Sequence, residues 1–241
     1  MGADEHADMD ALLNAFDGEI LALSNEGRPI KALRIGDAAV PATLLVVAGV
    51  HGDEPASVEG AVDLQRRLQA GTLTAARPFW LLPALNPDGL RRARKNNARD
   101  VDLNRNFPAA NFSTQHRPGY FPGPAPLSEP ETRALAALIG REAIDRLVAV
   151  HAPFACVNFD GPAQAWAEVV AGACGWPARA DIGYPTPGSL GTWLGRDRGL
   201  PILTLELPPG PFAGFAGACR AALAAAVGAT VVGDLLAPRT G

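Results

Sequence analysis

The sequence predicts an α/β domain. Short apolar runs rich in branched residues alternate along the chain with helix-like stretches, a pattern that is typical of this class. Three of these runs, at residues 43–50, 146–150 and 201–207, lead to or carry a side chain that can bind a metal or move a proton. We therefore expect one domain over residues 1–241, in which an N-terminal segment of residues 1–25 is partly frayed.

The first half of the chain contains two expected strands. Residues 43–50 (TLLVVAGV) form a continuous apolar run that predicts a buried strand. A helix is expected over residues 55–70, because Pro55 suits its first turn and a glycine follows its end. Residues 79–85 (FWLLPAL) indicate the next strand, and the NPDG sequence at residues 86–89 predicts a turn.

The second half of the chain begins with an irregular segment, residues 90–127, which is dense in Asn, Arg and Pro. A long segment without periodicity in a compact domain is commonly functional, and this composition favours a substrate-binding loop. Ser128 followed by Glu131 forms a capping box, which predicts a helix that ends near residue 142. The remaining elements are expected as a strand at 146–150, a helix at 161–173, a strand at 201–207 and a helix at 213–227.

Composition narrows the classes of partner. The formal net charge of −4 disfavours nucleic acid or an anionic membrane as the main partner, because both attract basic surfaces. The three cysteines include no CxxC pair, so neither a disulfide framework nor a cysteine-bound zinc is expected. The acidic N-terminus does not resemble a secretory signal, and no apolar stretch approaches the roughly 18 residues of a membrane span. These features favour a cytoplasmic location, and the oligomeric state is not readable.

A candidate metal site follows from side chains near the ends of the predicted strands. His51 and Glu54 form an HxxE motif after one strand, His151 follows another, and Glu206 lies near the end of a third. Ligands of open α/β sheets bind beyond the carboxyl ends of the strands, so these side chains are expected to converge. The HxxE motif alone is weak evidence, because a solvated loop with a helix-capping glutamate has the same pattern. Either of the other two residues alone is equally compatible with a structural role.

Longer motifs carry a resemblance to a known family. The sequences VHGDEP at 50–55, NPDG at 86–89 and DLNRNFP at 102–108 resemble, in order and spacing, the zinc carboxypeptidases of the carboxypeptidase A type. The sequences GYPTPGSLGTW at 183–193 and TLELP at 204–208 resemble a bacterial branch, the murein peptide amidases, which cut between γ-D-glutamate and meso-diaminopimelate in cell-wall peptides. The resemblance implies a single α/β domain with a mixed, twisted central sheet and helices on both faces.

The same resemblance implies a zinc-dependent hydrolase that acts in peptidoglycan recycling. One Zn²⁺ ion per chain would be held by His51, Glu54 and His151, the His₂Glu set of carboxypeptidase A. Glu206 matches the general base, which assists the attack of zinc-bound water and passes the proton to the leaving amine. The expected partner is a small peptide with a free terminal carboxylate.

Further residues match the substrate-binding positions of the family. Asn104 and Arg105 match the pair that holds the terminal carboxylate, and a planar guanidinium suits that task because it forms two parallel hydrogen bonds. Tyr184 matches a mobile tyrosine that closes over the substrate. The family also uses an arginine to stabilise the oxyanion of the tetrahedral intermediate. Arg94 is our assignment for that role, and Arg99 is the alternative.

Substrate specificity in the family is set near the position that Gly191 occupies. Glycine there is neither acidic nor bulky, which disfavours a digestive carboxypeptidase. Diaminopimelate has a second zwitterionic end that needs both cationic and anionic partners, and Asp160, Asp181 and Arg196 are candidates. The sequence favours an ordinary surface charge for each of these three residues.

Two alternative functions remain at this stage. The first is an N-acyl amino acid deacylase of the succinylglutamate desuccinylase or aspartoacylase type, which shares the HxxE loop and a similar Asn-Arg pair. The NPDG motif and the Tyr184 segment favour the peptidase. The second is a catalytically inactive peptide-binding module, which the presence of all ligands, the base and the carboxylate clamp disfavours.

Overall fold

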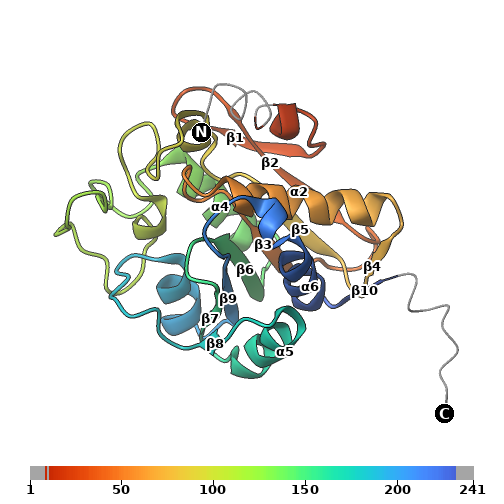
Figure 1. The fold of residues 1–241 in the computed structure, drawn as a ribbon. Helices are drawn as coiled ribbons and strands as arrows, with labels where there is room; N and C mark the ends of the chain where they lie inside the picture. Colours follow the sequence, from red (N-terminus) through yellow and green to blue (C-terminus); the bar gives the residue numbers. More distant parts are fainter. Residues whose placement is uncertain (1–8, 10, 232–241) are drawn as a thin grey trace, which may run out of the picture.

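The computed structural model describes residue 9 and residues 11–231. A β-sheet lies at the centre of the molecule, and helices and loops surround it (Figure 1). The strands of that sheet are β1 (Glu19–Leu23), β2 (Pro29–Ile35), β3 (Leu44–Val47), β5 (Phe79–Leu82), β6 (Arg146–His151), β7 (Cys156–Asp160), β8 (Ala178–Arg179) and β9 (Ile202–Glu206). A separate two-stranded sheet pairs β4 (Leu73–Ala75) with β10 (Ala229–Val231).

The eight strands lie in the order β1-β2-β5-β3-β6-β9-β7-β8. The four central strands β5, β3, β6 and β9 are parallel to one another, whereas β1 pairs with β2, β2 with β5 and β7 with β9 in antiparallel fashion. The sheet is therefore mixed, as the family resemblance implied. Because β3, β6 and β9 run in one direction, their carboxyl ends open at the same edge, which is where an α/β sheet holds its ligands.

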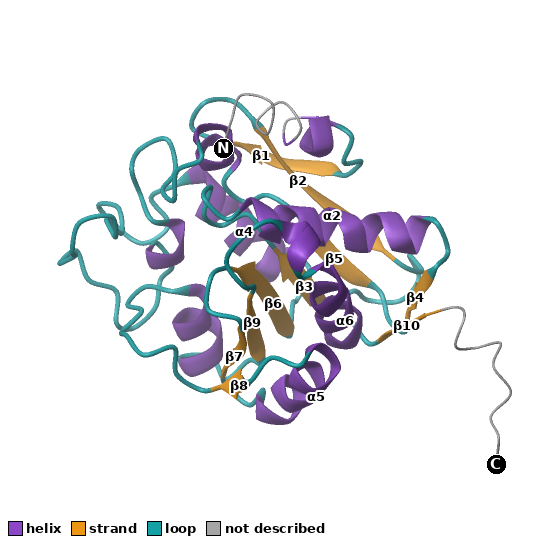
Figure 2. Ribbon diagram, viewed as in Figure 1, coloured by secondary structure: helices purple, strands orange, loops and turns teal. Residues whose placement is uncertain are grey.

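Helices cover both faces of the sheet (Figure 2). One core contains the inward residues of α2 (Pro55–Gln69), α5 (Gln164–Cys174) and α6 (Ala216–Ala226), packed on residues such as Val46 and Val148. The opposite core joins α4 (Pro130–Arg141) and the π-helix η2 (Gly191–Arg196) to residues such as Leu45 and Leu147. Successive residues of a strand point to opposite faces, so each central strand is apolar on both sides. The predicted fold class is confirmed.

Several local predictions need correction. The NPDG sequence does not form a simple turn but begins the short helix α3 (Pro87–Arg92), because the Asn86 side chain accepts a hydrogen bond from the Gly89 amide as an N-cap. Helix α4 is capped at Glu129, and the Ser128 hydroxyl donates to the Glu129 carboxylate and makes no cap hydrogen bond. The last predicted helix divides into a 3₁₀ turn, η3 (Phe212–Gly214), and α6.

The structure describes only part of the N-terminal segment, so the expected fraying of residues 1–25 stays a prediction. Residues 1–8 and 10 lie outside the described residues, but β1 pairs with β2 at one edge of the central sheet. The buried Asp88 carboxylate fixes the loop after β1, because it accepts hydrogen bonds from the Ser24 hydroxyl, the Glu26 amide and Arg28. Strands β1, β2 and β7 have short or alternating apolar patterns. Continuous apolar runs, on which the strand predictions rested, do not reveal strands of this kind.

Candidate active site

The HxxE loop leaves the carboxyl end of β3 and turns sharply into α2. A side chain at Gly52 would overlap the backbone of Gly89, since a Cβ built there lies 1.9 Å from the Gly89 carbonyl carbon. The Lys95 carbonyl also holds this loop in place, because it accepts hydrogen bonds from the Gly52 amide and the Asn86 side chain. The HGDE and NPDG motifs are therefore one structural unit, and it fixes the positions of His51 and Glu54.

His151 and Glu206 are brought together by strand register. They are the last residues of the parallel neighbours β6 and β9, and their Cα atoms are directly paired. Both residues are buried, with 3% and 5% exposure. Sheet topology thus joins two residues that are far apart in sequence, as the pattern of strand ends predicted.

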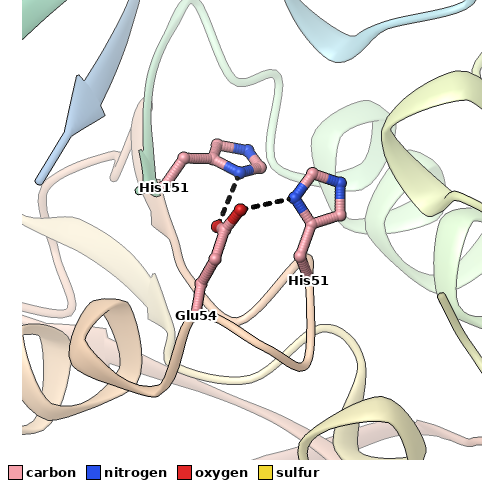
Figure 3. A group of neighbouring side chains, drawn as sticks. All are labelled: His51, Glu54 and His151. Atoms are coloured by element: carbon pink, nitrogen blue, oxygen red, sulfur yellow. Dashed lines mark hydrogen bonds and ion pairs between the residues drawn. The ribbon is translucent and has the colours of Figure 1, made fainter. Parts of the chain in front are cut away.

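His51, Glu54 and His151 form a group with the character of a metal site (Figure 3). One ligand atom from each residue lies within 4.8 Å of the others. The Nδ1 atom of His51 lies 2.7 Å from one Glu54 oxygen, and the Nδ1 atom of His151 lies 3.0 Å from the other oxygen. Two imidazoles and one carboxylate are an established ligand set for catalytic zinc, and three ligands leave a coordination position for water or substrate. The residues present therefore fit a zinc ion.

Two carboxylates contact the His51 ring on different nitrogens. Glu54 faces Nδ1, and the fully buried Asp102 lies 3.1 Å from Nε2. Burial lowers the pKa of His51, but the two negative charges outweigh that effect and raise it to about 10. Burial likewise acts to raise the pKa of Glu54, but His51 and His151 outweigh it and hold that pKa below its usual range. Asp102 also orients the ring, as carboxylates commonly do for histidines that ligate metals.

Glu206 stands apart from this ligand group but close to it in space. Burial raises its pKa, and the nearby Glu54 charge adds to the effect, while His151 and His51 oppose it. Among the described residues, its buried Oε2 atom has no hydrogen-bond partner. A buried carboxylate oxygen without a partner is costly, so it marks a position where substrate or water is expected to bind.

His51, Glu54, His151 and Glu206 line one cavity of about 140 Å³. Every predicted site residue except Arg94 lies in its wall, and so do the three candidates for substrate specificity. The residues that were predicted from the sequence and line this cavity are His51, Glu54, Asn104, Arg105, His151, Asp160, Asp181, Tyr184, Gly191, Arg196 and Glu206. The cavity therefore brings together residues from the sheet and from two long loops.

Asn104 and Arg105 lie in the 3₁₀ turn η1 (Leu103–Arg105), which Asp102 begins by accepting a hydrogen bond from the Asn104 amide. Arg105 is 5% exposed, and its guanidinium donates to the Asn104 carbonyl at 2.6 Å. Tyr184 is half-buried nearby; burial raises the pKa of its hydroxyl group, and the positive charge of Arg105 opposes that effect. Arg105 is therefore a buried cation held in a fixed position at the cavity wall.

The two arginines considered for the oxyanion role lie apart from the other predicted site residues. Arg94 and Arg99 are absent from the cavity wall, and Arg99 instead lies 3.7 Å from Glu129. Lys95 lines the cavity, and its Nζ atom lies 2.5 Å from Asp102 and 3.6 Å from the centre of the Tyr120 ring. The cause is local, because Ala93 adopts a left-handed conformation (φ 46°) after α3 and turns the following residues. Lys95 belongs to the same basic stretch of sequence as Arg94, and the sequence alone does not show which of the two side chains faces the cavity.

Asp102 and Asn106 were also missed as individual residues, although both belong to the DLNRNFP motif. Asn106 is fully buried, and its amide group donates to the carbonyls of Pro122 and Ala125 and to the Ser128 hydroxyl. Its Oδ1 atom accepts from Thr132 and from a backbone amide. A polar residue in a motif with no metal-binding chemistry is a signal for such a structural role, and here it holds the long loop of residues 107–128.

Comparison with known proteins agrees with the geometry. The zinc carboxypeptidase family matches residues 19–164, more than half of the chain. Murein peptide amidase A of Escherichia coli K12 is 40% identical over 177 residues, which cover 68% of this chain and 71% of that protein. Murein peptide amidase A of Vibrio campbellii is 36% identical over 179 residues, which cover 68% of this chain and 69% of that protein.

Solved structures give the same answer. The murein-tripeptide amidase of Escherichia coli O157 superimposes with a TM-score of 0.72 at 31% identity, covering 90% of this chain and 93% of that one. A carboxypeptidase A from Helicoverpa armigera shares the fold at 18% identity, with a TM-score of 0.70 and coverage of 95% and 74%. The chain belongs to the zinc carboxypeptidase family. It is a metal-dependent hydrolase of peptide substrates, and among known proteins it is similar to the murein peptide amidases.

A search of the described residues for membrane-crossing helices found none that combines the necessary length with sufficient apolarity.

Proposed function

We propose that this enzyme removes meso-diaminopimelate from γ-D-glutamyl peptides of murein. The observation that carries the proposal is the convergence of the His51, Glu54 and His151 group, the carboxylate of Glu206 and the guanidinium of Arg105 on one cavity. This set contains what hydrolysis next to a terminal carboxylate requires. The choice of murein peptides rests on the similarity to murein peptide amidase A at 40% identity.

His51, Glu54 and His151 would hold the zinc ion. Zinc bound there would lower the pKa of water to ~7 and polarise the scissile carbonyl. Asp102 keeps the His51 ring in place through Nε2, so that Nδ1 faces the metal position. The remaining steps depend on side chains of the protein itself.

Glu206 takes the proton from the attacking water and delivers it to the leaving amine. Its unpartnered Oε2 atom and its raised pKa suit this role, because a carboxylate that is too acidic accepts protons poorly. Arg105 pairs with the terminal carboxylate of the substrate, and Asn104 and Tyr184 complete the wall around it. A clamp of this kind orients the adjacent peptide bond and removes the entropy cost of aligning it during the reaction.

Lys95 supplies positive charge for the developing oxyanion in this scheme. Arg94 was assigned this role from the sequence, but the cations that line the cavity are Lys95, Arg105 and Arg196. An ammonium group has three donors, so the contact with Asp102 leaves Lys95 two further hydrogen bonds for the substrate. Comparison of variants at positions 94 and 95 separates the two assignments.

The test is hydrolysis of L-Ala-γ-D-Glu-meso-diaminopimelate by zinc-loaded protein, followed by detection of free diaminopimelate. Release of diaminopimelate that disappears in Glu206→Gln supports the proposal. Cleavage of N-acyl amino acids in preference to the tripeptide would instead favour the deacylase. No cleavage of either substrate by zinc-bound protein would favour a binding module. A cytoplasmic location stays a prediction from the sequence.

A further inference from the structure

Asp160, Gly191 and Arg196 form a charged corner of the cavity that the hydrolytic mechanism does not use. Asp160 is the last residue of β7, and Gly191 and Arg196 are the first and last residues of η2. A π-helix brings residues five apart onto adjacent turns, so Gly191 and Arg196 lie on the same side of η2. Both contact the Asp160 side chain, and all three residues line the cavity.

The Asp160 carboxylate has two distinct oxygens. Oδ1 accepts a hydrogen bond of 2.7 Å from Arg196 Nε. Oδ2 faces Gly191, where a Cβ atom would lie 2.3 Å away. Any side chain at position 191 would therefore displace this carboxylate, which gives a physical reason for the glycine. Within the part of the chain that the structure describes, no protein donor is seen on Oδ2.

Arg196 also has hydrogen-bond donors in addition to the one that contacts Asp160. Its Nε atom is the donor to Asp160, and its side chain is 59% exposed. The described residues show no partner for its two terminal nitrogens, which form the pair of parallel donors that suits a carboxylate. Asp160, in contrast, is 12% exposed in its side chain. The corner thus presents a largely buried anion next to a more exposed cation.

We propose that this corner selects a substrate whose C-terminal residue carries a second amino acid group at the end of its side chain, with Asp160 binding the distal ammonium and Arg196 the distal carboxylate. The inference rests on the proposed function and deepens it, since diaminopimelate has such an end. Asp181, the other candidate, is exposed and uses its carboxylate to cap the Gly183 amide. We therefore assign the Asp181 carboxylate to stabilising its own loop and not to binding the substrate.

The experiment uses four tripeptides, L-Ala-γ-D-Glu-X, with the zinc-loaded enzyme. X is meso-diaminopimelate, L-lysine, L-2-aminopimelate or L-norleucine, so the distal end has both groups, the ammonium alone, the carboxylate alone, or neither. We expect the native enzyme to prefer diaminopimelate in kcat/KM. Each distal group is expected to contribute ~10- to 100-fold, the usual range for a charge-assisted hydrogen bond. The effect of the ammonium is expected to be larger, because Asp160 is less exposed than Arg196.

Two variants assign the groups separately. Asp160→Asn is expected to remove the preference for diaminopimelate over aminopimelate, and Arg196→Gln the preference for diaminopimelate over lysine, while both variants retain norleucine cleavage. Arg198→Gln is the matched control, because Arg198 stacks on Trp193 and is absent from the cavity wall. It should keep all four rates.

The outcomes distinguish this inference from the proposed function. If the native enzyme cleaves none of the four tripeptides, the proposed function fails. If it cleaves them with equal kcat/KM, or if both variants lower all four rates by the same factor, the proposed function stands and the assignment of Asp160 and Arg196 is overturned.

Discussion

The two sides of the cavity are built in different ways. The metal side consists of His51, Glu54, His151 and Glu206, which lie at the carboxyl ends of parallel strands that are buried on both faces. The substrate side consists of residues from short helical elements, Arg105 in η1 and Gly191 in η2, together with Asp160 at the end of β7. The comparison indicates that the parallel strands position the proposed hydrolytic residues, whereas the proposed selectivity residues lie outside those strands, where substitutions need not disturb the metal ligands.

The largest effect is expected on the metal side. Glu206→Gln should lower kcat by ~10³-fold, within the usual contribution of general acid–base catalysis, because the amide cannot accept the proton. The zinc content measured by elemental analysis should stay at one ion per chain, since Glu206 lies outside the ligand group. A variant that keeps more than a tenth of the native kcat would show that another group acts as the base.

The next largest effect is expected from loss of the cation that stabilises the oxyanion. Lys95→Met should lower kcat by about 10²-fold, the scale at which one oxyanion donor contributes, whereas Arg94→Met should stay within about 2-fold of the native rate. Single-turnover kinetics would measure both variants. The reverse result would restore the assignment made from the sequence and would mean that the Lys95 pair with Asp102 is structural.

The stability of the folded protein should depend on Asn106, which holds the long loop of residues 107–128. Asn106→Ala removes the hydrogen bonds that join the long loop to α4 and leaves the carbonyl of buried Pro122 without its Asn106 donor. We expect a loss of about 3 kcal/mol in the free energy of unfolding, which lowers Tm by roughly 6–12 °C. Gln115→Ala, in an exposed part of the same loop, is the control and should leave Tm unchanged. Calorimetry that finds equal Tm values for both variants would remove Asn106 as the organising residue.

The smallest effect concerns protons. Since Glu54 and Asp102 raise the pKa of His51 to about 10, the metal-free protein carries a proton on His51 at pH 7.5, and zinc must displace it. Titration calorimetry in two buffers of different ionisation enthalpy should detect about one released proton per zinc. The raised pKa also stabilises the metal-free fold fully below pH 6.5, and that stability is lost as pH rises through about 10. Zinc binding without proton release would contradict the charge state of His51.

The sequence by itself determined the central parallel strands, the HxxE loop and the residues at the strand ends. These features have local causes, since continuous apolar runs of strand length bury both faces and a metal site requires a few specific side chains. The ligand group and Glu206 converge because parallel strands end at one edge, a consequence that follows from topology once the class is known.

Tertiary structure alone decided which cation faces the cavity and what the glycine at position 191 is for. Lys95 lines the cavity and Arg94 does not, because the left-handed Ala93 and two hydrogen bonds to the Lys95 carbonyl set the direction of the chain. Gly191 and Asp160 approach each other from separate elements, so their contact has no local pattern. A difference of one residue in register, or a close approach between distant segments, depends on packing across the whole fold and leaves no periodic trace in the sequence.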